Sequence, residues 1–386
     1  RETYGPEAFV CSLNDPDAPG VACAFVYACW HAPSPVAEAE SRRALTPDVE
    51  PPKLPVVSLD AGQVANDVAT AQAELVPRRG LWLDDVYLLM VIRFEAGRVM
   101  HIGGYVVQQA TEVVDNLKRT WLLTGQTPLA LVAQRNSANI STAITNAGSV
   151  VAQQLMNSAW RQKDTYFTVD AARADPASPS VTTQTGVLQP LSTIKDVARA
   201  AETNYGMDLR FKVNYDVAFV PSSTGITLRP VVWTGEYGAD RRISTGVNPV
   251  SLYLTKIANG WKAVDDRSRQ VTKIVGTGSA TSYTNARALE NPYGNRKEQV
   301  VQSSSSGASR VNSQSRTKLY DGRSVTRIQV DMALPPDRFG LGLGDVFSVN
   351  VNGQPASAWL NVIHYSWGSR GESVTGRLDV EIQKWT

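Results

Sequence analysis

The stretch that decides the fold is Leu341-Gly342-Leu343-Gly344-Asp345-Val346-Phe347-Ser348-Val349. A glycine-rich approach leads through a Gly-Asp step into a segment in which apolar and polar residues alternate. That period of two is typical of a β-strand. Asn352-Gly353 then predicts a tight turn, and the return strand is expected over Ala358–Trp367. The pattern indicates a β module built for assembly, with no catalytic residue set into it.

The same period of two recurs along the C-terminal half of the chain. It predicts strands at Thr227–Trp233, Ser251–Ile257, Val271–Val275, Thr326–Met332, Val346–Val351, Ala358–Trp367 and Leu378–Ile382. Further upstream, Val86–Phe94 and Val99–Val107 are predicted to pair as a hairpin. In the most regular strands apolar and polar side chains take opposite faces, so we expect one buried side and one that meets solvent or a partner.

Apolar residues spaced three or four positions apart predict helices elsewhere. The best-marked helix has Ser192 or Thr193 as its N-terminal cap and ends at Gly206. Further helices are predicted at Ala61–Leu75, Asn139–Gln162 and Ala308–Leu319. Together these elements predict a mainly β fold with a smaller α/β part.

The length of 386 residues predicts two or three domains, and a hydrophobic content of 42% is enough to fill their cores. We expect an N-terminal β-rich domain at 1–135, a small α/β domain at 136–220 and a C-terminal β domain at 221–386. Segments of these domains are free to interleave. A proline-rich insertion at about 32–58 is expected to run as an extended connection within the first domain.

Charge and hydropathy exclude several classes of protein. The chain has 38 Lys and Arg against 36 Asp and Glu, a net charge of +2, so there is no strong global field to recruit nucleic acid or an anionic bilayer. The longest apolar run, Val86–Ile92, has the length of a strand, whereas a helix that crosses a bilayer needs about 20 apolar residues. We therefore expect no membrane-spanning segment.

All three cysteines lie in the first thirty residues, and an odd number argues against a complete disulfide framework. Cys11, Cys23 and Cys29 are interpreted as buried or idle thiols of a protein made in a reducing cytosol. Together with His31, the last two provide too few ligands for a structural zinc site. No metal is predicted.

Candidate catalytic motifs are weak throughout the sequence. Only His31, His101 and His364 are available for histidine chemistry, and each is interpreted as structural. The sequence holds no nucleophile elbow, no phosphate-binding loop with Lys-Ser/Thr and no zinc-protease motif. Gly276-Thr277-Gly278 lacks the third glycine and the following helix of a dinucleotide site. We predict no catalytic residue and no cofactor.

Paired carboxylates and tryptophans leave an alternative open. Asp84-Asp85 and Asp265-Asp266 could flank a sugar bond as in a glycosidase, but they are interpreted as loop acids, and Glu298 as a structural or interfacial partner of Arg296. The nine tryptophans would suit a sugar-binding platform if several were exposed together. Those on or near predicted strands are Trp233, Trp261, Trp359, Trp367 and Trp385. Core packing is the commoner fate of such residues.

Five phrases occur in the order found in one known family. They are Val232–Arg242, with its Asp-Arg element, the strand pair Val247–Ile257, the valine-and-glycine strand Val271–Gly276, the Tyr-Gly-x-Arg-x-Glu phrase of Tyr293–Val301, and the Gly-Asp strand Gly344–Val346. In this order they resemble the tail-hub proteins, also called baseplate-hub or minor tail proteins, of long-tailed bacteriophages. Gly104–Val106 and Trp121–Leu131 fit more loosely, so the resemblance runs from about Val86 to the C-terminus.

The resemblance implies antiparallel β-barrel or sandwich domains of the tail-tube type. It also implies a structural virion protein and not an enzyme. Members of that family are expected to form a homotrimer at the tail tip, to join the distal tube ring to fibre or tip proteins and the tape-measure protein, and to leave a lumen through which DNA passes. Two alternatives stay open. One is a carbohydrate-binding or cell-wall-hydrolysing β protein, and the other is the hub of a related injection or gene-transfer particle.

Overall fold

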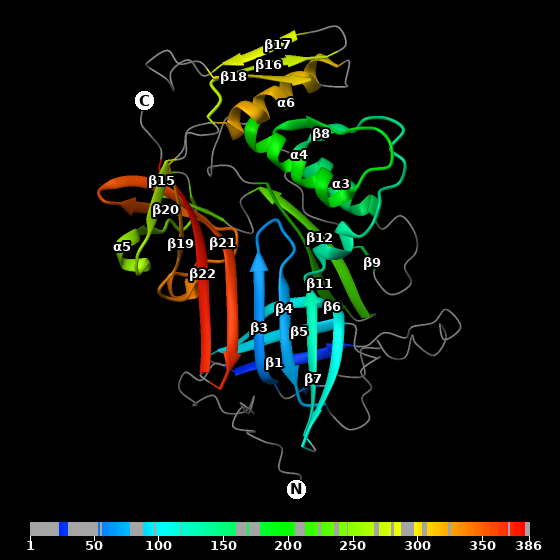
Figure 1. Cartoon of the computed structure of the whole chain (residues 1–386), viewed down its shortest axis with the longest axis vertical. Coiled ribbons are helices and arrows are strands. Elements are labelled where there is room, and N and C mark those ends of the chain that lie inside the picture. The colour runs from blue at the N-terminus through cyan, green and yellow to red at the C-terminus, as the bar shows by residue number, and fades with distance from the viewer. Residues whose placement is uncertain are drawn as a thin grey trace.

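The computed structural model describes a β-rich molecule in which the longer helices, α3, α4 and α6, gather at one end (Figure 1). The described residues are 23–29, 53–54, 56–77, 88–95, 98–116, 118–159, 168–169, 178–204, 213–222, 225–234, 239–244, 246–265, 270–278, 282–286, 297–302, 307–322, 326–369 and 371–382. Within them the strands form one large sheet and three small ones.

The large sheet combines strands from both ends of the sequence. Its members are β1 (Cys23–Cys29), β2 (Lys53–Leu54), β3 (Val56–Val64), β4 (Thr70–Leu75), β5 (Leu88–Glu95), β6 (Arg98–Asp115), β7 (Lys118–Gln126), β13 (Asp240–Arg241), β14 (Ser251–Tyr253), β15 (Lys262–Asp265), β19 (Thr326–Asp331), β20 (Val346–Val351), β21 (Gln354–Gly368) and β22 (Gly371–Ile382). They follow the order β15-β19-β22-β21-β3-β4-β7-β6-β5-β1-β2, and β20 branches from β21 to carry β13 and β14. The predicted fold class, mainly β with a smaller α/β part, is confirmed.

The long strand β21 connects two regions of this sheet. Its first half pairs with β20 and its second half with β3, while β22 runs beside both halves. The change of partner coincides with a register shift between Leu360 and Val362. There the main-chain carbonyl of Asn361 accepts a hydrogen bond from the N–H of Ala65 at 2.8 Å. The Asn361 amide also donates to Asp379 at 2.6 Å. Since a bulge bends its strand, this residue redirects β21 from one region to the other.

The N-terminal part of the sheet has its own core, to which β21 contributes one buried residue, Tyr365, and one partly buried residue, Trp367. Tyr365 is buried in the same cluster as Tyr105 of β6 and Trp121 of β7. The helix predicted at Ala61–Leu75 is wrong, because this segment forms part of β3, a turn and β4. Along β4 the buried residues alternate with more exposed ones, and the small alanines among them belong to the same buried cluster as the large aromatic residues. Alanine was mistaken for a helix former here because tertiary packing overrides propensity.

An α/β unit packs against the end of the turn between β3 and β4. Its elements are α2 (Leu129–Ala133), β8 (Thr145–Ala147), α3 (Gly148–Ala159), β9 (Thr168–Val169), β10 (Ser180–Thr182), α4 (Pro190–Asn204), β11 (Val213–Ser222) and β12 (Gly225–Thr234). A continuous apolar core joins α2, α3 and α4 to β11. The Asn66 side chain of the β3–β4 turn reaches β11, donating to the carbonyl of Val213 at 3.0 Å and accepting from the N–H of Tyr215 at 2.7 Å.

Two helices predicted in this unit are confirmed, but each begins at a different residue from the one predicted. The helix predicted at Asn139–Gln162 begins only at Gly148, because the preceding residues pair with β10. At Gly148 an added Cβ would lie 2.5 Å from Cβ of Ala201, so α3 and α4 approach closely there. The later helix begins at Pro190. The hydroxyls of Ser192 and Thr193 donate to the carbonyl of Gln189 instead of capping the N-terminus as predicted.

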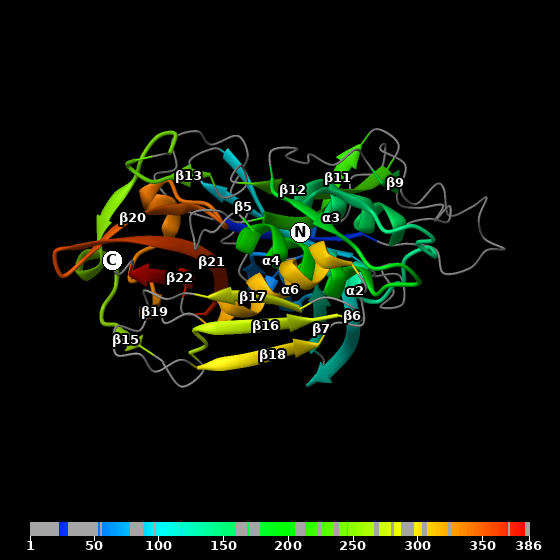
Figure 2. The same ribbon diagram turned by 90° about the horizontal axis from the view of Figure 1, so that it is seen from above.

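Beyond the large sheet and the α/β unit, a small third layer of strands and one helix packs over α4. It consists of β16 (Lys273–Thr277), β17 (Ser282–Ala286), β18 (Glu298–Gln302) and α6 (Ala308–Asp321). Figure 2 looks down on this three-stranded sheet, with α6 and then α4 beneath it. The prediction of a helix at Ala308–Leu319 is confirmed. Gly276 permits the close contact, because an added Cβ would lie 2.1 Å from the Ser315 hydroxyl of α6.

The C-terminal region of the large sheet curves around a separate core. The segment from β14 to β15 crosses this core from β20 to β19, and its middle forms the short helix α5 (Leu254–Ile257). The strand predicted at Ser251–Ile257 is therefore confirmed only for Ser251–Tyr253. The turn at Asn352-Gly353 is confirmed, with φ of 51° and 86°, the left-handed values that a two-residue hairpin turn of this type requires. The domain limits 1–135, 136–220 and 221–386 stay a prediction.

Candidate functional site

The Gly-Asp strand and the Asp-Arg element, more than a hundred residues apart in sequence, lie side by side in the structure. β13 runs parallel to the start of β20, with Asp240 beside Val346 and Arg241 beside Phe347. The N–H of Val346 donates to the carbonyl of Ala239 at 3.2 Å. Two of the phrases that carry the resemblance thus form one local structure, which we call the Gly-Asp junction (residues 239–244, 246–250 and 342–348).

The carboxylate of Asp345 is the centre of the Gly-Asp junction. Only 3% of the residue is exposed, and its two oxygens accept hydrogen bonds from the N–H groups of Ala239 and Gly342, each at 2.8 Å. Nε of Arg241 lies 3.0 Å from the second oxygen. Burial raises the pKa of Asp345 above its ordinary value, while the Gly342 N–H, the Arg241 charge and the Ala239 N–H oppose that rise. These contacts make Asp345 a structural anchor between two segments.

Gly344, directly before Asp345, adopts a backbone conformation that explains why the position is glycine. Gly344 has φ of 84°, a left-handed conformation that residues with a side chain rarely adopt. This conformation lets the chain turn so that the N–H of Gly344 donates to the carbonyl of Leu360 at 2.7 Å. In the other direction, the N–H of Leu360 donates to the main-chain carbonyl of Asp345 at 2.9 Å. The glycine-rich approach is therefore the turn that directs Asp345 inward, and no ligand is needed to explain it.

The loop after β13 is held just as firmly. The buried guanidinium of Arg242 donates to both oxygens of Asp240, at 2.8 Å from Nε and 2.5 Å from Nη2. At Gly246 an added Cβ would lie 2.4 Å from the carbonyl oxygen of Asp240, so the loop closes on itself. This rigid loop presents two apolar side chains to the outside, Ile243 at 66% exposure and Val247 at 75%.

The other predicted residues do not come together as a catalytic site among the described residues. His364 of β21 lies 2.8 Å from the Asp60 carboxylate of β3, and both side chains are partly exposed. Glu298 pairs with Lys273 at 2.6 Å. The side chains of His101, Asp265 and Trp233 lie outside the description. So do the predicted residues Cys11, His31, Asp84, Asp85, Asp266, Arg296 and Trp385.

The tryptophans with described side chains do not form an exposed row. Trp121 is fully buried, and Trp261, Trp359 and Trp367 are partly buried. This arrangement gives no support to a sugar-binding platform. Within the described part of the chain there is also no group of three or more His, Cys, Asp or Glu side chains arranged to hold a metal ion. None of the helices described is long and apolar enough to cross a membrane.

Comparison with known proteins yields matches in structure alone. No protein-family model matches the sequence, and no curated protein matches it. Among solved structures, a tail protein from Neisseria meningitidis MC58 superposes with a TM-score of 0.51 at 12% identity, over 93% of this chain and 96% of that one. The fold is that of solved phage-type tail proteins.

Two prophage proteins extend this likeness. The tail protein of prophage MuSo2 from Shewanella oneidensis has a TM-score of 0.52 at 10% identity and covers 86% of this chain and 95% of that one. A prophage tail protein from Listeria monocytogenes EGD-e has a TM-score of 0.51 at 14% identity, with coverage of 94% and 95%. The likeness therefore extends over nearly the whole length of each chain. At such low identities it is a likeness of fold.

Proposed function

We propose that this chain is a structural subunit of a bacteriophage tail, and that it serves as the hub at the distal end of the tail tube. The observation that carries this proposal is the fold, which is shared with three tail proteins over 86–94% of this chain. A fold alone does not assign a function, but a likeness over 86–94% of the chain favours a shared role more than a match to one widespread domain would. The Gly-Asp junction adds support, because it is built from phrases that resemble those of hub proteins.

A hub works by assembly, so the proposal requires surfaces that meet other subunits. Ile243 and Val247 are apolar, exposed and fixed on the rigid loop of the Gly-Asp junction, where the N–H of Ile243 also donates to the Ser348 hydroxyl at 3.1 Å. A contact made by side chains that are already ordered loses less conformational entropy on binding. We infer that this loop contacts a neighbouring copy in a homotrimer.

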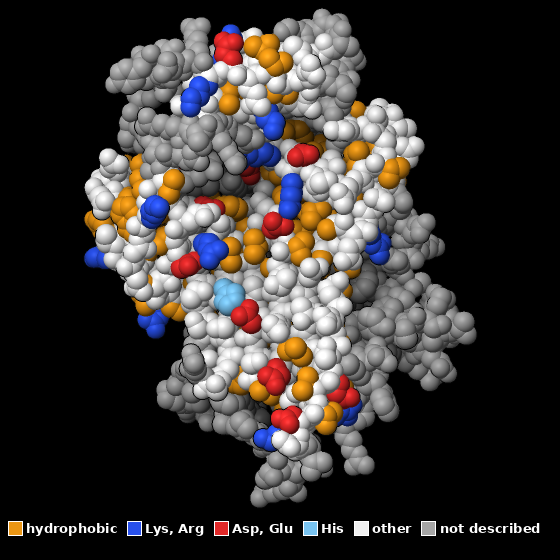
Figure 3. Space-filling view, viewed as in Figure 1, with side chains coloured by type: hydrophobic (Ala, Val, Ile, Leu, Met, Phe, Trp, Pro, Cys, Tyr) orange, Lys and Arg blue, Asp and Glu red, His pale blue; other side chains and the backbone are white. Residues whose placement is uncertain are grey.

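The same proposal assigns the remaining partners. The trimer would join the distal tube ring to fibre or tip proteins, contact the tape-measure protein, and enclose a lumen through which DNA passes without specific binding. On the face shown in Figure 3, basic and acidic side chains are interspersed and no broad basic area forms. Together with a net charge of +2, this suits a passage more than a duplex-binding protein, which would hold phosphates with clustered Lys and Arg. No enzymatic step is part of the proposal.

Mass photometry and electron microscopy of the purified chain, and of particles that contain it, test the assembly. The expected result is a particle with three-fold symmetry located at the tail tip. A single monomeric copy per particle, with its sheet edges sealed internally, would contradict the proposal. A three-fold particle found in a gene-transfer or injection apparatus would keep the hub assignment but change the kind of particle.

Paired variants test the loop contact. Ile243→Asp together with Val247→Asp places charges on the inferred contact and is expected to give monomers that keep the circular dichroism spectrum of the folded chain, because both side chains are exposed in the free chain. The matched control is Val187→Asp in the α/β unit, where the side chain is 62% exposed. We expect the control to leave the trimer intact. If the double variant forms trimers as the control does, another surface makes the contact.

A further inference from the structure

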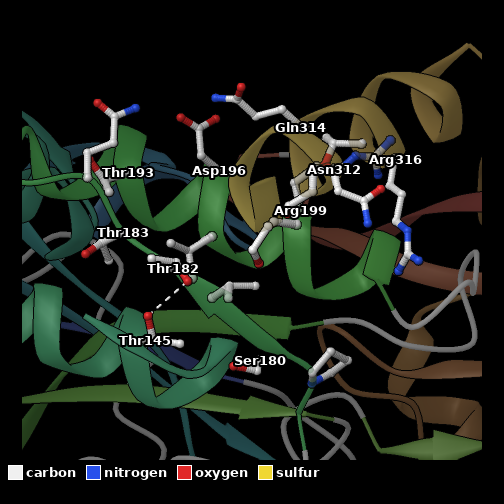
Figure 4. A pocket seen from close by; sticks show the side chains of 18 of the residues that line it. Thr145, Ser180, Thr182, Thr183, Thr193, Asp196, Arg199, Asn312, Gln314 and Arg316 are labelled. Atoms are coloured by element: carbon white, nitrogen blue, oxygen red, sulfur yellow. Dashed lines mark hydrogen bonds between the residues drawn. The ribbon is translucent and has the colours of Figure 1, made fainter. Parts of the chain in front are cut away.

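A half-open cleft of about 850 Å³ lies where the α/β unit meets the third layer (Figure 4). Hydroxyl and amide side chains make up most of its described lining, together with Asp196 and Arg199 of α4 and Arg316 and Lys318 of α6. No aromatic side chain belongs to that lining, and Arg199 already lies 3.6 Å from the carboxylate of Glu202. Such a lining is typical of a hydrated gap between two packed layers. It does not select one class of ligand.

At the opposite end of the molecule, β6 and β7 extend beyond β3 and β4 as a two-stranded ribbon (Figure 1). The pairing of β7 with β4 ends at Trp121, whereas its pairing with β6 continues to Lys118. Residues 111–116 are all exposed. Since successive side chains of a strand point to opposite faces, both faces of the ribbon meet solvent in the free chain. We call residues 111–116 and 118–120 the arm.

A cluster of three side chains holds the arm in place. Glu112 and Arg119 form an ion pair across the two strands, and the indole N–H of the buried Trp121 donates to the same carboxylate at 3.2 Å. The guanidinium of Arg119 also lies over the ring of Trp121, 5.8 Å from its centroid. The arm is therefore tied to the core of the N-terminal part of the sheet. A contact made by an arm that is already ordered loses less conformational entropy on binding.

One face of the arm continues the buried side of the sheet. Glu112 lies directly opposite Trp121 in the ladder, so Val114, two residues further along β6, is on the face that buries Trp121. Val114 is 68% exposed and therefore extends that face beyond its last buried residue. Val113 is 45% exposed and points to the other face. A partner that covered Val114 would continue the core of the N-terminal part of the sheet.

The charges of the arm compensate one another. Glu112 forms the ion pair with Arg119, and Asp115 lies directly opposite Lys118 in the ladder. The loop of the Gly-Asp junction matches this neutrality, because residues 243–249 carry no charge. Burying a charge without its partner is strongly unfavourable. A contact between the arm and this loop avoids that cost on both sides.

A closed ring of three copies uses two different surfaces of each copy. In a cyclic trimer every interface is heterologous, so a patch on one copy meets a different patch on the next. The loop that carries Ile243 and Val247 therefore requires a partner surface elsewhere on the same chain. Figure 2 shows β13 and β20, which flank that loop, well apart from β6 and β7. The arm is thus a separate surface, apolar on one face and already ordered.

We propose that the arm is this partner surface. The Val114 face of one copy contacts Ile243 and Val247 of the next copy, and three such contacts close the ring. This inference rests on the homotrimer proposed above and adds which two surfaces of the chain meet. The contact places exposed apolar side chains of both copies at its centre, where interfaces are depleted of charge.

Cysteine crosslinking of the full chain with a short bis-maleimide tests the contact. Val114→Cys combined with Val247→Cys is expected to give covalent trimers, because each copy then offers one new cysteine to each of its neighbours. Each single variant should give no more crosslinking than the unchanged chain, which measures what the three native cysteines contribute. Val187→Cys combined with Val247→Cys is the matched control, since Val187 is 62% exposed but lies in the α/β unit, and it should not crosslink above that level.

Mass photometry of the same samples before crosslinking distinguishes two kinds of failure. Trimers in which the double cysteine variant crosslinks no more than its control would overturn the contact between arm and loop, but would leave the hub assignment intact. Monomers at every concentration would contradict the hub assignment and the contact together. Crosslinking of Val114→Cys alone would mean that the arms meet one another, and this would also overturn the proposed contact.

Two further variants separate the faces of the arm. Val114→Asp places an unpaired charge in the contact, so the concentration at which trimers dissociate is expected to rise at least about tenfold. Val113→Asp is the matched control on the opposite face of the same arm, and it should change that concentration less than about threefold. Circular dichroism shows that both variants are folded. Equal changes in the two variants, or no change in Val114→Asp, would overturn the proposal.

Discussion

Asp345 in the Gly-Asp junction and Asn66 in the β3–β4 turn both tie together segments that are distant in sequence. Asp345 does so with a buried charge that bonds to two N–H groups beside a guanidinium. Asn66 does so with a neutral amide that imitates a strand partner at the edge of β11. A buried charge whose partners are lost is far more unfavourable than a lost neutral bond. We call these two contacts joints. Loss of the joint at Asp345, in the C-terminal region, should destabilise the fold more than loss of the joint at Asn66.

The largest effect is expected from Asp345→Ala. The change removes the acceptor of two buried N–H groups and leaves the neighbouring Arg241 unpaired, so we expect a loss of about 3–5 kcal/mol in the free energy of unfolding. Urea denaturation measures it. Asp331→Ala is the matched control, because that carboxylate forms an exposed ion pair with Arg377 at 2.9 Å and should contribute less than about 1 kcal/mol. Equal losses in the two variants would remove the distinction between the joints.

Gly246→Ala tests the rigidity of the loop beside Asp345. The new methyl group would lie 2.4 Å from the carbonyl oxygen of Asp240 and 2.5 Å from the N–H nitrogen of Arg242, so the backbone must move. We expect a loss of about 2–3 kcal/mol, the upper part of the range of about 1–3 kcal/mol for overpacked sites, because the methyl group would meet backbone atoms. Thermal unfolding measures it, and Gly260→Ala is the control because nothing lies within 4 Å of its added methyl. A loop that accepts the methyl group without loss would be softer than the structure indicates.

A smaller effect is expected at the other joint. Asn66→Ala removes both bonds to β11 and places alanine at φ of 60°, so we expect a loss of about 2 kcal/mol. Asn66→Gly removes the same bonds but suits that conformation, and the difference between the two variants separates backbone strain from hydrogen bonding. Chemical denaturation of both variants provides the comparison. If Asn66→Gly has no effect, the two bonds contribute little and the apolar core alone holds the joint.

The two joints also differ in how well the sequence predicts the local structure around them. The Gly-Asp strand, its Asn352-Gly353 turn and the long alternating strands could be predicted because local pattern and fold agree there. Asn66 falls inside a segment predicted as a helix, where alanines that suit a helix instead belong to the β-sheet core that contains Tyr105 and Trp121. The only local signal for the true structure was Asn66-Asp67, a typical turn pair between two alternating runs.

The candidate sites follow the same division. The sequence identified the phrases that meet at the Gly-Asp junction but could not show that they meet, because the pairing of β13 with β20 is non-local and parallel. The cleft of Figure 4 was not predicted at all. Its lining comes from five separate elements whose Thr, Ser, Asn and Gln residues are typical of any surface, and only the packing of α6 against α4 brings them together.

The smallest effect concerns the strand that Asn66 holds. Burial raises the pKa of Asp216 on β11 to about 7, although the N–H of Val217, which donates to it at 2.7 Å, opposes the rise. The folded chain therefore keeps this proton between pH 4 and 7, where the unfolded chain, with an ordinary value of 3.8, has released it. Stability should fall as pH rises through that window and stay reduced above it. Asp216 is only partly buried, so solvent screens its charge and we expect less than the full pKa change implies. Asp216→Asn cannot lose a proton there, so it should be more stable than the unchanged chain by about 1–2 kcal/mol at pH 8 and about equal to it at pH 4. Urea unfolding at a series of pH values measures both curves. If the curves run parallel, Asp216 is ordinarily solvated, and the joint at Asn66 is as open to water as an edge strand would be.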